Sequence, residues 1–241
     1  MFVNIIKNIE NIFIYFFLFI KMESKYKFEE LMKERHSARD FLQKEIPEET
    51  VKEIINIALN SPSWCNSQPW NVYVVSGKPL EEIKKEWISK NEQKIKGYAD
   101  LQPVHRTEFS ERCQKNMEEE FKLIKEATND PELTAFWRKN IECFNAPVIV
   151  YLTLHKGHSK WSCYDLGSFG MSLMLAAKDY GVDSVVAYEL AKYPDVLRKH
   201  AKIPENEDIC VGIALGYEND ELVNKFRAKK SNIDEVCHFI K

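Results

Sequence analysis

Apolar residues recur along the chain at spacings that predict helices. One amphipathic helix is marked by four residues at the i, i+3, i+4 and i+7 positions: Val51, Ile54, Ile55 and Ala58. Pro47 suits its first turn. Further helices are predicted over 28–35 and over 165–180, where Gly181 provides the stop. Because the 165–180 helix is apolar on most faces, we expect it to be central. The 28–35 helix carries its apolar residues on one side: Phe28, Leu31 and Met32.

Four short apolar runs rich in β-branched residues are predicted strands: 72–75, 148–153, 185–187 and 209–215. The last run is apolar enough to lie inside a sheet. Together with the helices, these runs predict an α+β fold in which helices flank a sheet of about four or five strands.

The region over about 80–140 has a different character. It is dense in Lys and Glu, and its thinly spaced apolar residues recur at helical intervals. We expect two or three surface helices, with breaks near 97–103 and at Asn129-Asp130-Pro131. This region is interpreted as an insertion or cap over the core. For most of it, solvated helices without a role in the active site are an equally open interpretation.

The N-terminus carries an apolar run over 12–20, flanked by Lys7 and Lys21. The run is shorter than the roughly 20 residues of a membrane-spanning helix, and no small-residue cleavage site follows it. We favour an upstream extension from a wrongly chosen start codon, with Met22 as the start, although a membrane anchor or a packed segment stays open. The expected organisation is therefore an extension over 1–21 and a single domain over 22–241. No membrane association is expected unless residues 1–21 are native and anchor the chain.

Composition narrows the class of protein. The 241 residues carry a formal net charge of −3 with both signs mixed throughout, so neither nucleic acid nor a cationic partner is predicted. None of the six cysteines forms a Cys-x-x-Cys pair, and no His pair stands at metal-ligand spacing, so no metal site is expected. Widely spaced cysteines in a chain of this size predict free thiols in a reducing compartment, and hence a cytoplasmic protein.

The segment Arg35-His36-Ser37-Ala38-Arg39 carries the first candidate chemistry. In an extended chain, residues i, i+2 and i+4 share a face, so Arg35, Ser37 and Arg39 converge. Two guanidiniums and a hydroxyl suit a phosphate, because Arg binds phosphate bidentately. The chain has no Gly-x-Gly-x-x-Gly or P-loop motif that would bind phosphate instead. Taken alone, these five residues also fit a charged surface at a helix end.

The loop Pro62-Ser63-Trp64-Cys65-Asn66-Ser67-Gln68-Pro69-Trp70 is the second candidate. Its two prolines restrict the backbone on either side of small and amide side chains. Asn66 and Gln68 each offer donor and acceptor groups, which is the chemistry needed to read the edge of a flavin pyrimidine or a ribityl chain. A structured turn is the alternative. We expect Trp70 to belong to the core and Cys65 to be a small buried side chain.

With these two segments in this order, the chain resembles the FMN-dependent nitroreductase family. In that family an Arg-x-Ser-x-(Arg/Lys) segment holds the FMN phosphate, and a Pro-Ser-x-x-Asn-x-Gln-Pro-Trp loop contacts the flavin and the ribityl chain. The resemblance implies that FMN is bound by the residues at the matching positions: Arg35, His36, Ser37, Arg39, Pro62, Ser63, Asn66 and Gln68.

The resemblance extends over about residues 26–236 and adds four candidate ligands: Ala187, Tyr188, Arg227 and Lys230. The first two lie where family members approach the reactive face of the flavin. The last two belong to a segment that resembles the family's C-terminal phosphate-binding element, with Lys where Arg is usual at position 230. The family fold is an intertwined homodimer with a mostly antiparallel sheet and FMN at the subunit interface. We therefore expect the polar tail to reach across the partner and bring both cations to the phosphate.

The resemblance also implies the reaction. NADH or NADPH reduces bound FMN in a ping-pong cycle, and a small-molecule acceptor, such as a nitroaromatic compound or a quinone, takes the electrons. Because the cofactor carries the chemistry, no side chain is assigned a catalytic role. Two alternatives stay open: an enzyme of the same fold that performs dehalogenation, flavin destruction or dehydrogenation, and a non-catalytic FMN-binding protein. We expect the divergent 80–140 region to influence the choice of acceptor.

Overall fold

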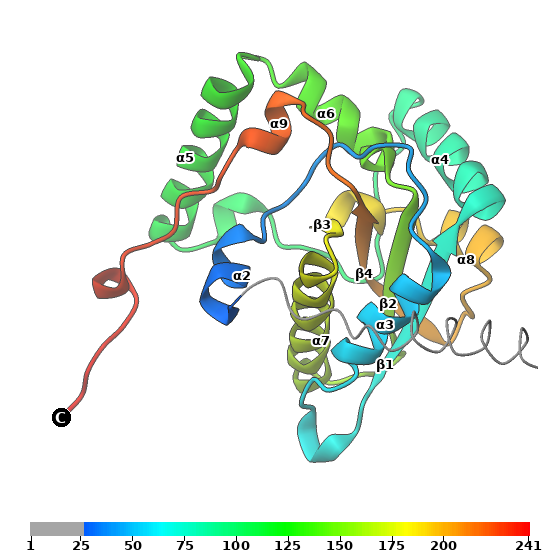
Figure 1. Cartoon of the computed structure of the whole chain (residues 1–241), viewed down its shortest axis with the longest axis horizontal. Coiled ribbons are helices and arrows are strands. Elements are labelled where there is room, and N and C mark those ends of the chain that lie inside the picture. The colour runs from blue at the N-terminus through cyan, green and yellow to red at the C-terminus, as the bar shows by residue number, and fades with distance from the viewer. Residues whose placement is uncertain (1–26) are drawn as a thin grey trace, which may run out of the picture.

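The computed structural model describes residues 27–241, so the apolar run at 12–20 lies outside the described residues. Four strands form one sheet: β1 (Trp70–Ser76), β2 (Val148–His155), β3 (Asp183–Ala187) and β4 (Glu207–Gly216). Their spatial order is β1-β2-β4-β3, and every neighbouring pair is antiparallel (Figure 1). All four predicted strands are confirmed. β2 is buried over all but its last residue, because helices cover both faces of the sheet.

The helices form one layer on each face of the sheet (Figure 1). On one face lie α3 (Glu48–Ala58) and α7 (Lys160–Asp179), which enclose a core with Trp70 and the inner residues of β2. On the other face lie α4 (Gly77–Glu92) and α8 (Pro194–Ala201). The α8 helix was not predicted from the apolar pattern, although Pro194 occupies its first position.

The α7 helix is central, as its apolar sequence predicts. It buries Leu166, Phe169 and Leu173, and the Phe169 ring stacks on Trp70 with centroids 4.9 Å apart. The helix begins at Lys160, earlier than predicted, where the Ser159 hydroxyl caps it by accepting from the Ser162 amide. The first turns escaped prediction because their large side chains face outward and add nothing to the buried periodicity.

The region over 80–140 divides into two parts with different surroundings. α4 packs Leu80, Ile83 and Trp87 into the core beneath the sheet, so this part of the expected insertion belongs to the core. α5 (Glu111–Thr128) and α6 (Thr134–Ile141) instead form a separate apolar cluster with the C-terminal α9 (Leu222–Lys225). Both predicted breaks are confirmed, and a left-handed Asn129 ends α5.

The remaining elements are short. α2 (Phe28–Glu34) confirms the first predicted helix, but none of its residues is buried in the single chain. Within residues 27–241, no helix is long and apolar enough to cross a membrane. Five single turns of 3₁₀-helix complete the described chain: η1 (Trp64–Asn66), η2 (Arg106–Glu108), η3 (Cys143–Asn145), η4 (Tyr188–Leu190) and η5 (Ile233–Glu235).

Candidate cofactor site

The Arg35–Arg39 segment runs beside the free edge of the sheet. Ser37 pairs with Ser184 of β3 in a parallel bridge, and the Ala38 amide donates to the Ser184 carbonyl at 3.1 Å. The backbone at Arg35 is already extended where it leaves α2. The predicted extended conformation is therefore confirmed at these positions, and it is held by the edge strand rather than by the segment itself.

Two guanidiniums of this segment are partly desolvated, and neither has a carboxylate at hydrogen-bond distance in the described chain. Burial lowers the pKa of Arg35, and its Nε is buried without a hydrogen-bond partner among residues 27–241. Burial also lowers the pKa of Arg39, which the Glu120 carboxylate offsets only in part. The Arg39 guanidinium and the Glu120 carboxylate lie 3.9 Å apart. Such cations are expected to recruit an anion, because a buried charge without a close partner is unfavourable.

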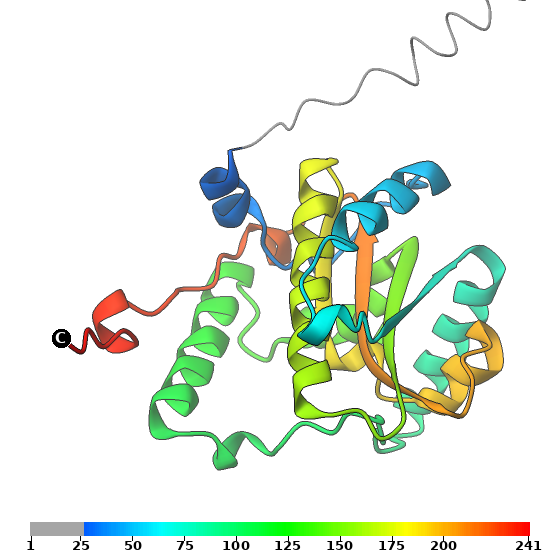
Figure 2. The same ribbon diagram turned by 90° about the horizontal axis from the view of Figure 1, so that it is seen from below.

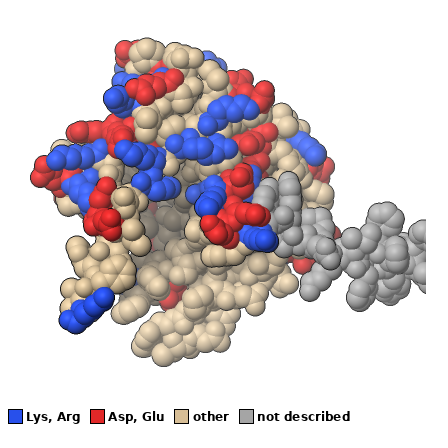
Figure 3. Space-filling view, turned by 60° about the vertical axis from the view of Figure 1, so that its left-hand side comes forward, with Lys and Arg blue, Asp and Glu red and all other residues tan. Residues whose placement is uncertain are grey.

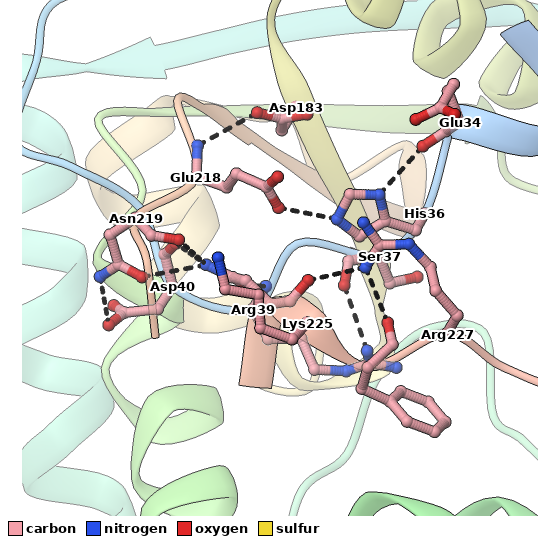
Figure 4. A network of polar contacts seen from close by, with 12 residues as sticks. Glu34, His36, Ser37, Arg39, Asp40, Asp183, Glu218, Asn219, Lys225 and Arg227 are labelled. Carbon is pink, nitrogen blue, oxygen red and sulfur yellow. Dashed lines mark hydrogen bonds and ion pairs between the residues drawn. The ribbon is translucent and has the colours of Figure 1, made fainter. Parts of the chain in front are cut away.

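His36 fastens the same segment to the end of β4. Its Nε2 lies 2.7 Å from Glu218 Oε2, and its Nδ1 lies 3.0 Å from the Glu34 carbonyl oxygen (Figure 4). The Glu218 amide in turn donates to the Asp183 carboxylate at 3.1 Å. The imidazole therefore engages the Glu218 carboxylate and ties the segment to the chain that follows β4.

Arg227 lies in the same network, whereas Lys230 lies farther along the tail. The Arg227 guanidinium donates to the carbonyl of Asn224 at 2.7 Å, and the Asn224 side chain accepts from the Arg39 amide at 2.7 Å (Figure 4). Arg227 is thus linked through Asn224 to the Arg39 backbone of its own chain, and the expected crossing of the tail to a partner stays a prediction. Lys230 lines a shallow pocket of about 280 Å³ between the tail and α5.

This network fits a phosphate group. Asn224 links the Arg39 backbone to the Arg227 guanidinium, and Arg35 and Ser37 belong to the same short segment. Of the nearby carboxylates, Glu218 is engaged by His36, Asp40 is paired with Lys139, and Glu120 lies 3.9 Å from Arg39. Fixed, partly dehydrated guanidiniums bind a doubly charged phosphate more strongly than exposed lysines do. The residues present therefore suit the phosphate end of FMN, the cofactor that the sequence resemblance implies.

The second predicted segment forms a tight, exposed loop. Cys65, Asn66 and Gln68 all have positive φ, and the Ser63 hydroxyl accepts from the Gln68 amide at 2.9 Å. The amide side chains of Asn66 and Gln68 make no hydrogen bond within the described residues and are exposed, as is Pro62. They are therefore available to a ligand.

Two side chains of this loop test the expectations about burial. Trp70 is buried in the core, as predicted. Cys65 is exposed, so the prediction of a small buried side chain is wrong. The reason is the left-handed backbone at Cys65 and Asn66, which turns the loop outward while the Trp64 amide anchors it to Asp165 of α7.

Ala187 and Tyr188 close the far end of β3. Ala187 pairs with Gly212, and its backbone leads directly into η4. Tyr188 is partly exposed, and burial together with nearby Glu189 raises the pKa of its phenol. Its hydroxyl packs so closely on Gly97 that a methyl group there would lie 2.9 Å away. This contact holds Tyr188 against the segment that leads into the α5–α6 region.

The two halves of the predicted site do not meet within one chain. The Asn66–Gln68 loop is attached to α7 through Asp165 and through a hydrogen bond from Ser61 to Ser172. The arginine segment is attached instead to β3, which follows the C-terminal end of α7 in the chain. In Figure 2 the dark blue α2 and the cyan loop occupy separate places along α7. The structure therefore unites the phosphate-binding candidates and leaves the amide loop to a different surface.

Several residues that hold the arginine segment escaped the sequence analysis. They are isolated polar residues that the fold brings together, of which the first two are buried and the last two half-buried: Asp40, Asn224, Asn145 and Asn219. No periodicity or motif marks them, because each acts through a contact with a distant part of the chain. The only local signal was the position of Asp40 directly after Arg39.

Comparison with known proteins identifies the family. The sequence pattern of the Nitroreductase family matches residues 32–217. The 4-nitrobenzoate reductase of Pseudomonas putida is 26% identical over 216 residues, covering 88% of this chain and 95% of the relative. Chloronitrobenzene nitroreductase of Comamonas testosteroni is 26% identical over 225 residues, covering 88% and 96%. The chain belongs to the nitroreductase family.

A solved structure extends the likeness to three dimensions. The FMN-dependent nitroreductase NfnB from Mycobacterium smegmatis, determined in complex with NADPH, superposes with a TM-score of 0.81 at 25% identity. The match covers 88% of this chain and 97% of that one. The predicted α+β, nitroreductase-like fold is confirmed.

Proposed function

We propose that this protein is a homodimeric, FMN-dependent oxidoreductase that uses NADH or NADPH to reduce nitroaromatic compounds or similar electron-poor acceptors. The observation that carries the proposal is the partly desolvated pair Arg35 and Arg39 beside β3: Arg35 Nε is buried without a hydrogen-bond partner in the described residues, and Arg39 has only the Glu120 carboxylate, 3.9 Å away. The names of the relatives support the acceptor class, and the NADPH complex of the neighbouring structure supports the electron donor.

The residues of this chain have distinct tasks in the proposal. Ser37, Arg35, Arg39 and Arg227 hold the phosphate, and Lys230 adds positive charge at its border. Ala187 lies three residues beyond Ser184 on the same strand, about 10 Å away, which supports a contact between its backbone and the flavin. FMN, when bound, supplies the two-electron chemistry, and the chain holds, orients and shields it.

A second subunit would bring the amide loop to this site. Exposed aromatic side chains on the loop and on the first turns of α7 support such an interface: Trp64 is 65% exposed, Trp161 64% and Tyr164 67%. The C-terminal tail adds Phe239 and Ile240, which are 78% and 92% exposed. Figure 3 shows charged side chains crowded on the upper part of one face, with a hollow and an almost uncharged surface below.

The dimer is tested by placing a charge in this aromatic surface. Trp161→Arg should yield a monomer by light scattering after gel filtration and should weaken FMN binding, because Asn66 and Gln68 of the partner no longer complete the site. Leu101→Arg places the same charge at another exposed apolar residue and should leave a dimer. A dimeric Trp161→Arg variant with normal FMN affinity contradicts the proposed interface.

The activity is tested with the purified chain and anaerobic stopped-flow mixing. We expect a yellow protein whose flavin absorbance bleaches on mixing with NADH or NADPH and returns when nitrobenzoate or a quinone is added. Bound flavin that neither nucleotide bleaches would indicate a non-catalytic FMN-binding protein. Flavin that bleaches but does not pass its electrons to any nitroaromatic compound or quinone would indicate a different reaction on the same fold.

The proposed location is the cytoplasm. All six cysteines are free, which supports a reducing compartment. Fractionation of cells that express the chain from Met1 and from Met22 tests this proposal, and membrane recovery of only the longer form would assign an anchoring role to residues 1–21.

A further inference from the structure

Asp40, next to the phosphate-binding candidates, is a buried carboxylate with an unusual set of partners. Only 2% of the residue is exposed. Its Oδ1 accepts from the Asn145 amide group at 2.7 Å, and its Oδ2 accepts from the Asn219 amide group at 2.7 Å. Lys139 of α6 places its Nζ 2.8 Å from Oδ2. One carboxylate thus joins α6, η3 and the turn after β4.

The backbone of Arg39 and Asp40 is held by the same cluster. Asn224 accepts from the Arg39 amide at 2.7 Å and donates to the Asp40 carbonyl at 2.8 Å. The Asn219 backbone N–H also donates to the Asp40 carbonyl, at 3.2 Å. Because the Asn224 carbonyl accepts from Arg227, the cluster fixes both ends of the phosphate-binding network relative to each other.

One partner of Asp40 is held in a strained backbone. Cys143, Phe144 and Asn145 have φ values of 51°, 58° and 57°, and consecutive left-handed residues other than glycine are unfavourable. The Phe41 amide donates to the Phe144 carbonyl, so this turn is tied to the same segment. The structure maintains an unfavourable turn at the point where it delivers the Asn145 side chain to Asp40.

We propose that Asp40 is a positioning residue for the cofactor phosphate, acting through the backbone and side-chain placement of Arg39 and Arg227. The inference rests on the proposed function, since it assumes that this network binds FMN. A carboxylate beside a phosphate site is electrostatically unfavourable to the ligand. The burial of the Asp40 carboxylate among three donors is explained by the geometry that it imposes on its neighbours. Positioning and charge therefore predict opposite effects of Asp40 on FMN binding.

The test compares two flavins that differ only in the phosphate. Dissociation constants for FMN and riboflavin are measured by quenching of flavin fluorescence, with the full chain and with Asp40→Asn. Asn keeps the shape but loses one acceptor and the charge, so the FMN constant should rise about tenfold or more. The riboflavin constant should change less than about twofold, because riboflavin lacks the phosphate.

Two further variants make the comparison decisive. Glu207→Gln alters another buried carboxylate, which accepts from Tyr73 and Thr153 at the opposite end of β4, and should leave the ratio of the two constants unchanged. Asn219→Ala removes one donor to the Asp40 carboxylate without changing the net charge, and should raise the FMN constant selectively. This variant decides the question if Asp40→Asn does not fold.

The outcomes separate this inference from the proposed function. An unchanged ratio of FMN to riboflavin affinity in Asp40→Asn overturns the positioning role, and so does tighter FMN binding, which charge repulsion alone predicts. If the unaltered chain binds neither flavin, the proposed function itself fails. A selective loss of FMN affinity in Asp40→Asn, with Glu207→Gln unaffected, supports the inference.

Discussion

Replacing Arg39 with Met separates cofactor binding from the stability of the apoprotein. The Arg39 side chain is 16% exposed, donates to the Ser37 carbonyl at 3.1 Å, and lies 5.6 Å from the centre of the Phe136 ring. Met fills similar space among these apolar neighbours. It loses a hydrogen bond and a cation–π contact, each about 1 kcal/mol, but it also removes the unfavourable burial of a charge. We therefore expect the unfolding free energy of the apoprotein to change by no more than about 1 kcal/mol.

The effect on FMN should be much larger. Two charge-assisted hydrogen bonds to the phosphate are worth about 3 kcal/mol together, which corresponds to roughly a hundredfold in the dissociation constant. At an FMN concentration of about 100 times its original dissociation constant, the cofactor stabilises the unaltered chain by about 2.7 kcal/mol. The same concentration stabilises Arg39→Met by only about 0.4 kcal/mol.

Urea unfolding with and without FMN measures both quantities. Arg138→Met serves as the matched control, because Arg138 is exposed on α6 and pairs only with Glu142 in the described chain. The control should gain as much stability from FMN as the unaltered chain. If FMN stabilises Arg39→Met as much as the unaltered chain, Arg39 does not bind the phosphate and its assignment to the phosphate site is wrong.

Two other perturbations test the core. Gly216→Ala should lower the unfolding free energy by about 1–3 kcal/mol in urea titrations, because the new methyl group would lie 2.7 Å from the Phe41 ring. Gly170→Ala meets ordinary contacts at 3.6 Å within a helix and should be neutral or stabilising. The Cys143 thiol should resist a thiol reagent at pH 8 while exposed Cys65 reacts, since burial raises the pKa of Cys143 from 9.0 to about 12. As the pH rises, the thiol ionises in the unfolded chain before it ionises in the folded protein, so the unfolding free energy should fall between about pH 9 and 12. A Cys143 that reacts at pH 8, or an unfolding free energy that does not change over this pH range, contradicts the prediction.

Periodicity recovered the elements whose burial follows a regular repeat. The four strands were predicted because each is a short apolar run rich in β-branched residues, and the central helix because it is a long run that is apolar on most faces; the predicted ends differ from the observed ones by a few residues. α8 was missed because its buried face is short, and the role of α4 in the core was missed because Lys and Glu dominate its sequence. In both helices a few buried side chains determine how the helix packs on the sheet, and the amino-acid composition of the helix does not show which residues they are.

The candidate site divides in the same way. The types of residue that suit a phosphate could be recognised at Arg35, Ser37 and Arg39 from the sequence, because an extended backbone alone brings alternate residues to one face. Their partners were not readable. Ser184, Asn224 and the other buried amides come from distant parts of the chain, and only the packing of the sheet edge brings them together.

The sequence by itself determined the class of fold, the segments that carry the site and the kind of ligand that they suit, because these depend on local spacing and side-chain chemistry. The tertiary structure decided which of these segments meet. It linked Arg227 to the Arg39 backbone through Asn224 within one chain, attached the Asn66–Gln68 loop to α7 instead, and buried Asp40 among three donors. The physical reason is that desolvation and hydrogen bonding between distant residues arise only when the chain has folded, and they set the charge and geometry of the site.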